Sequence, residues 1–136
     1  MHGQTAVEYL MLFSLVFAIL SLLTYYAQEM TERNREEIII SNAIIAANKI
    51  AEAADIVYTQ GEPSQITLSV YIPENVQAIE FSNKMIILKI KVASGINDVF
   101  AASKAPFDLT SFISTTSGTK RIKVKAEGGY VKVTES

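Results

Sequence analysis

The chain has 136 residues, 49% of them hydrophobic, and a formal net charge of −2. It contains no cysteine, and His2 is its only histidine, which excludes disulfides, thiol chemistry and zinc sites built from these ligands. With the commonest general base confined to the second residue, we expect no catalytic residue, no metal site and no cofactor. Residues 4–64 carry eight acidic and three basic side chains, whereas residues 65–136 carry nine basic and six acidic ones.

The first expected element is an apolar, charge-free run over residues 9–27, interrupted by two serines and one threonine. About 20 residues at 1.5 Å per residue extend roughly 30 Å, the thickness of a bilayer's hydrocarbon core. The run therefore predicts a membrane-spanning helix, in the simplest case a signal anchor. Glu8 stands at its start, and a carboxylate deep in a bilayer helix costs about 2.5–3.5 kcal/mol, so we expect this residue to have a function.

The helical pattern continues beyond the apolar run, because no glycine or proline interrupts residues 4–60. We expect one helix over 4–60, with its apolar half at 9–28 and a total length of roughly 80 Å. Residues 28–37 are polar on all sides, which is typical of a solvated or bridging helix and leaves open whether this part stays helical. Residues 38–58 are apolar over most of their circumference. Such a helix is either buried deeply in its own head domain or, as we favour, packs on that domain and on neighbouring copies.

The C-terminal part begins with turn chemistry at Gly61-Glu62-Pro63-Ser64. Period-two alternation then predicts strands near 66–72, 79–81, 86–92, 99–102, 119–126 and 131–133, with a tight turn at Ser82-Asn83 and a hairpin at Glu127-Gly128-Gly129-Tyr130. The head over 61–136 is thin for an independent core, so its sheet is expected to pack on the helix at 38–58. The fold class is α+β, a long N-terminal helix followed by a small antiparallel β-sheet or sandwich.

Some features of the head do not follow from strand pattern alone. Phe100, Phe107 and Phe112 are expected to fill the core, and the Ser/Thr-rich stretch at 110–119 to form an exposed loop. Five basic residues could line one face of the sheet: Lys89, Lys91, Arg121, Lys123 and Lys125. That face is either simply solvated, or it contacts anionic surfaces, nucleic acid or the acidic arms of neighbouring subunits. We do not expect nucleic acid as a partner, because no aromatic residues alternate with these lysines and this arginine, as they do in proteins that bind single strands.

The run Gly3-Gln4-Thr5-Ala6-Val7-Glu8-Tyr9-Leu10 resembles the processing site of archaeal type IV pilins with class III signal peptides. That family has a glycine before the cut, a glutamine after it, glutamate as the fifth mature residue, then tyrosine and a hydrophobic helix. The motif covers about 8 residues of this chain. The expected architecture, a long helix with a small β-rich head, is also similar to that family.

The resemblance implies that a prepilin peptidase removes residues 1–3 as a leader, with Gly3 and Gln4 forming the processing site. The precursor would lie in the cell membrane, and an assembly ATPase and a membrane platform protein would build copies into an extracellular homopolymeric filament. Adhesion to an unidentified surface is the implied role. Glu8 and Tyr9 would serve assembly and register. The filament core would be formed by large apolar residues of the first helical half: Leu10, Leu12, Phe13, Val16, Phe17, Ile19, Leu20 and Leu23.

Cleavage would also create a partner for Glu8, namely the α-amine of Gln4 on the same or a neighbouring subunit. Because a buried charge without its partner costs several kcal/mol, such a pair could set the axial register. Two alternatives stay open: a minor pilin or pseudopilin of a secretion or DNA-transfer system, and a monomeric signal-anchored surface protein. An enzyme is disfavoured by the missing histidine and cysteine.

Overall fold

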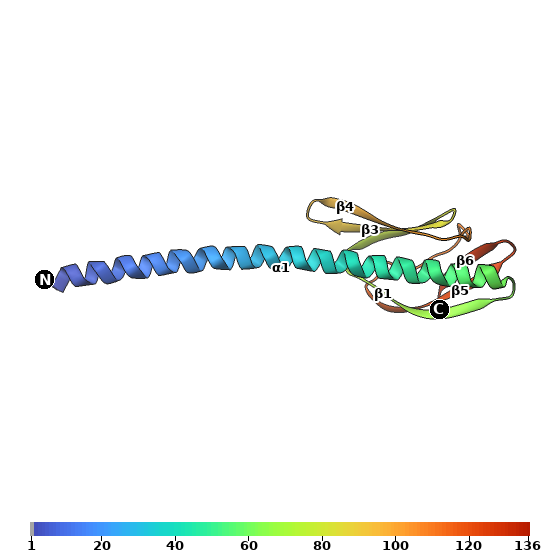
Figure 1. Cartoon of the computed structure of the whole chain (residues 1–136), viewed down its shortest axis with the longest axis horizontal. Helices are drawn as coiled ribbons and strands as arrows, with labels where there is room; N and C mark the ends of the chain where they lie inside the picture. Colours follow the sequence, from blue (N-terminus) through green and yellow to red (C-terminus); the bar gives the residue numbers. More distant parts are fainter. Residues whose placement is uncertain (1) are drawn as a thin grey trace. The chain divides into compact units, whose positions relative to one another are not determined.

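The structure, a computed structural model, describes residues 2–136. It contains one helix, α1 (His2–Gln60), followed by six strands: β1 (Gln65–Ile72), β2 (Val76–Ser82), β3 (Met85–Val92), β4 (Gly95–Ala102), β5 (Gly118–Glu127) and β6 (Tyr130–Glu135) (Figure 1). The expected α+β class is thereby confirmed. The chain divides into two compact units, residues 1–36 and residues 37–136, which are described separately below.

Helix α1 includes the polar stretch 28–37, so the question whether that stretch stays helical is answered for this structure. The helix ends where the sequence predicts. Gly61 has a positive φ of 78°, and its N–H donates to the carbonyl oxygen of Val57 over 3.0 Å. This left-handed residue satisfies one of the last carbonyl groups of the helix, a position that glycine adopts without strain.

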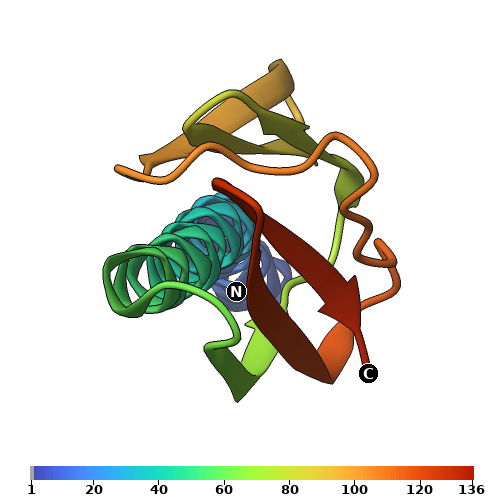
Figure 2. The same ribbon diagram turned by 90° about the vertical axis from the view of Figure 1, so that its right-hand side faces the viewer.

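The strands form two three-stranded antiparallel sheets, one in the order β1-β5-β6 and one in the order β2-β3-β4. Within the unit of residues 37–136, the sheets lie on different sides of the α1 segment, as both views show (Figures 1 and 2). The turn between β2 and β3 falls at 83–84, one residue later than expected. Gly128 and Gly129 have φ values of 43° and 91°, as a type I′ turn between β5 and β6 requires.

The core of this unit is one cluster that combines α1 with both sheets, as the sequence predicts for residues 38–58. The helix contributes small side chains, including Ala43, Ala47 and Ala54, which let the sheets approach closely, and two fully buried branched residues, Ile50 and Val57. The inward positions of the strands supply the large residues: Val70, Ile72, Ile86, Leu88, Ile90, Ile122, Val124, Val131 and Val133. Alternation with period two thus identifies the inner face of both sheets correctly.

The connection between β4 and β5 is fastened at two points. At its start, the Asp55 carboxylate of α1 accepts hydrogen bonds from the Ser103 hydroxyl over 2.6 Å and from the Lys104 N–H over 2.7 Å. Further on, the connection runs along β6, where the Val131 N–H donates to Pro106 and the Phe112 N–H donates to Val133. The connection therefore covers one edge of the β1-β5-β6 sheet, which would otherwise expose unpaired backbone groups.

Two expectations about the head are wrong. Phe107 is buried as expected, but Phe100 and Phe112 are 57% and 68% exposed. Phe100 occupies an outward position of β4, between the buried residues Val99 and Ala101. The five basic residues do not share one face, because Lys89 and Lys91 lie on β3 whereas Arg121, Lys123 and Lys125 lie on β5 of the other sheet. The sequence pattern does not distinguish one six-stranded sheet from two smaller ones.

Candidate assembly surfaces

In the unit of residues 1–36, the described residues 2–36 are all helical, and nearly all their side chains are exposed to solvent. Helix α1 is the one helix among the described residues that is long and apolar enough to cross a membrane, and its most apolar window is fully exposed. The residues expected in the filament core all lie in this exposed part: Leu10, Leu12, Phe13, Val16, Phe17, Ile19, Leu20 and Leu23. Exposure of so large an apolar surface indicates that lipid or another protein covers it.

The serine and threonine hydroxyl groups of the apolar run are satisfied inside the helix. The side chains of Ser14, Ser21 and Thr24 each donate to the carbonyl oxygen four residues earlier, over 2.8 Å in each case. This geometry removes the need for water at these three positions. These three side chains can therefore enter a dry environment with their hydroxyl groups paired.

The residues of the expected processing and register sites occupy the first turns of α1. Gly3, Gln4, Glu8 and Tyr9 are helical and exposed. A side chain added at Gly3 would meet nothing within 4 Å. Gln4 and Glu8 are four residues apart and so lie on the same side of the helix, one turn from each other. The ion pairs found within residues 2–136 do not include the Glu8 carboxylate.

Next to the apolar run lies a polar segment that contains an ion pair. Arg33 and Glu29, four residues apart, form a contact of 2.7 Å between exposed side chains. An exposed pair of this kind adds about 0.3–0.5 kcal/mol to the helix. The pair stabilises the helix locally, and it carries no sign of catalytic or metal chemistry.

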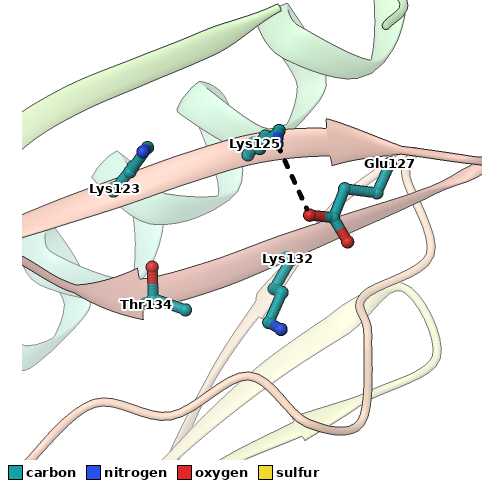
Figure 3. A pocket seen from close by; sticks show the side chains of 5 residues that line it. All are labelled: Lys123, Lys125, Glu127, Lys132 and Thr134. Atoms are coloured by element: carbon teal, nitrogen blue, oxygen red, sulfur yellow. Dashed lines mark ion pairs between the residues drawn. The ribbon is translucent and has the colours of Figure 1, made fainter. Parts of the chain in front are cut away.

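The outer face of β5 and β6 carries a cluster of lysines that the sequence indicated only in part. Lys123 and Lys125 on β5 and Lys132 on β6 line a shallow hollow of about 220 Å³ together with Thr134 and Glu127 (Figure 3). Lys125 stands directly opposite Lys132 in the strand register, an arrangement of like charges that destabilises a sheet. The Glu127 carboxylate, 3.8 Å from the Lys125 ammonium group, compensates part of this repulsion.

Two carboxylates, those of Asp108 and Glu135, hold the β4–β5 connection in place. Asp108 accepts hydrogen bonds from the N–H and the hydroxyl of Thr110, which lower its pKa, and the nearby Lys132 lowers it further. Glu135 accepts one from the Ser114 N–H and contacts the Lys120 ammonium group at 3.4 Å, and these contacts also lower its pKa. These interactions order a loop that the sequence predicted only as exposed.

Within residues 2–136 no group of three or more histidine, cysteine, aspartate or glutamate residues could hold a metal ion. Comparisons with protein-family models, with curated proteins and with solved structures find no match to this chain.

Proposed function

We propose that this chain is the structural subunit of an archaeal type IV pilus and polymerises through its N-terminal helix into an extracellular filament. The observation that carries the proposal is the exposed, membrane-length apolar run, which follows directly after a motif resembling a pilin processing site. The small β-rich head, which shares one core with the C-terminal part of α1, fits the same architecture. Adhesion is the role that we assign to such a filament.

The apolar run suits two environments in succession. A bilayer interior and the centre of a filament both exclude water, so the same surface of large apolar side chains is stable in each. The internally bonded hydroxyl groups of Ser14, Ser21 and Thr24 fit both environments as well. A subunit could thus leave the membrane for the filament without any rearrangement of this surface.

Glu8 has a different task in this proposal. Cleavage between Gly3 and Gln4 creates an α-amine one helical turn from the Glu8 carboxylate, and neighbouring subunits bring further amines close. A paired carboxylate is tolerated in a dry filament centre, whereas an unpaired one costs several kcal/mol. The pair would therefore favour the axial offset that brings the charges together, and it would form only after processing.

The proposal is tested by mass spectrometry of filaments sheared from cells that express the full chain. A mature N-terminus at Gln4 is expected, together with loss of filaments in Glu8→Val and retention of Glu8→Val protein in the membrane. Glu32→Val, which removes an exposed acid from the polar segment, is the matched control and should still assemble. Normal filaments from Glu8→Val would refute the role of Glu8. A chain that begins at Met1 and stays in the membrane fraction would favour a monomeric anchored protein instead.

A further inference from the structure

The unit of residues 37–136 presents two apolar side chains on a rigid loop, Leu109 and Phe112, which are 80% and 68% exposed. The loop is ordered by the two hydrogen bonds that the Asp108 carboxylate accepts from Thr110, and by the Phe112 N–H, which donates to Val133 over 3.0 Å. Exposed apolar residues on a fixed backbone lose little conformational freedom when a partner buries them, as in the anchors of protein interfaces. We call Leu109 and Phe112 the loop anchor.

The same unit has a second exposed apolar surface on α1. Ile38, Ile45 and Ile56 are each about half exposed or more, and at 100° per residue they fall within about 20° of one line along the helix. The line is about 27 Å long and faces away from the buried positions such as Ile50. Next to Ile56 lies a shallow hollow of about 300 Å³. We call these three isoleucines the helix stripe.

The charges near the two surfaces are complementary. Lys123, Lys125 and Lys132 lie on the outer face of β5 and β6, and the loop anchor belongs to the segment paired with β6. Proximity of Lys132 to this segment is also reflected in the lowered pKa of Asp108. Around the helix stripe, the acids Glu37, Glu52 and Asp55 outnumber the bases Lys49 and Lys104, and Asp55 and Lys104 both line the hollow next to Ile56. One surface is therefore apolar and basic, and the other is apolar and acidic.

We propose that the loop anchor of one copy packs on the helix stripe of the next copy, with the lysines of β5 and β6 facing Glu37 and Glu52. Because the two surfaces are different parts of the same unit, this contact is heterologous and can repeat from copy to copy without closing into a pair. The inference rests on the proposed function, since the filament is what brings successive copies together. It assigns to the unit of residues 37–136 a specific contact, separate from the contacts that the apolar run over residues 9–27 would make in the filament core.

The absence of cysteine from the chain permits a direct test by disulfide cross-linking of the full-length protein in membranes and in sheared filaments. The double variant Ile45→Cys with Phe112→Cys should give a ladder of covalent oligomers on mild oxidation. Each single variant should stay monomeric, because a heterologous contact needs one cysteine of each kind. Both positions are exposed, so neither change removes a buried contact. Ile45→Cys combined with Ser94→Cys, an exposed turn residue, is the matched control and should give no ladder.

A second arm tests the charges. In the background of the double cysteine variant, Lys123→Glu should reduce the ladder at least several-fold, and adding Glu52→Lys should restore it. Lys91→Glu, on the other sheet, should leave it unchanged.

Two results would overturn the contact: filaments without a ladder, and dimers formed by Phe112→Cys alone, which would reveal a symmetric pairing. Filaments processed at Gln4 but lacking the ladder would leave the pilus proposal intact. A ladder in membranes of cells that make no filament would support the contact and refute the pilus. A third result would assign the lysines to another partner: the head binds anionic vesicles or polymers, and Lys123→Glu abolishes this binding while the ladder persists.

Discussion

The most informative single substitution is Ile50→Ala, because Ile50 is the largest α1 side chain that is wholly buried between the sheets. The change removes about three methylene-sized groups, worth about 0.8 kcal/mol each on transfer from water, which gives about 2.4 kcal/mol. A cavity adds to this figure, since sheets on both sides of the helix limit collapse. The expected loss is about 3–4 kcal/mol, within the range of about 2–5 kcal/mol for such core substitutions.

Hydrogen exchange of the full chain in detergent micelles measures this loss of stability within the unit of residues 37–136. The amide of Val124, in the central strand β5, should lose protection by about 100- to 1,000-fold, since each 1.36 kcal/mol corresponds to a factor of ten. For a unit of about 100 residues, the same change should lower the melting temperature by more than about 10 °C.

Ile45→Ala is the matched control, because it makes the same chemical change on the same helix at a side chain that is 51% exposed. Because Ile45 is only half buried, its truncation should cost about half of the transfer free energy and leave no cavity. The expected loss of stability is about 1 kcal/mol, which corresponds to less than a tenfold change in protection. Equal effects of the two substitutions would refute the assignment of the core to this face of α1. A loss below about 1 kcal/mol for Ile50→Ala would refute the tight packing of the helix between the sheets.

Two further predictions concern the connection between β4 and β5. Asp55→Ala leaves the Ser103 hydroxyl and the Lys104 N–H without their acceptor, so it should destabilise the head by about 1–3 kcal/mol. The same hydrogen-exchange experiment measures this loss. Glu52→Ala, at an exposed position of the same helix, is the control and should be nearly neutral. Asp108 and Glu135 have lowered pKa values when folded, so their contribution to stability is complete above the ordinary carboxyl range and is lost as the pH falls through their folded values. Protection of the amides that they hold should therefore decrease below about pH 4 and stay constant from pH 5 to 7.

Much of the fold follows from local signals in the sequence. Helix α1 follows from an unbroken run without glycine or proline, and its end follows from Gly61. The β5–β6 hairpin follows from Gly128-Gly129, because only residues that tolerate positive φ fit its turn. Each of these features is decided within a few residues, so tertiary contacts do not need to be known.

The errors arise where long-range pairing decides the outcome. Alternation identifies which strand residues face inward, but it does not say which strands pair, so the lysines of β3 and β5 were assigned to one face. Phe112 was expected in the core because aromatic residues are usually buried. Its place is set by backbone pairing with β6, which turns the side chain outward. Phe100 carried a usable signal, since its outward position follows from the register of Val99 and Ala101.

The two apolar surfaces that the head leaves exposed answer a question raised by the composition of α1. Residues 38–58 are more apolar than one small domain needs, and the structure accounts for only part of this excess, since the buried positions occupy about 160° of the helix at 100° per residue. Deep burial within the chain's own head is therefore wrong as a complete explanation, because Ile38, Ile45 and Ile56 stay exposed. If lipid covered them, the charged neighbours Lys49 and Glu52 would enter the bilayer as well, at a cost of about 2.5–3.5 kcal/mol each at its centre. In the proposed contact, a second copy with lysines and an apolar loop would cover the same isoleucines without that cost.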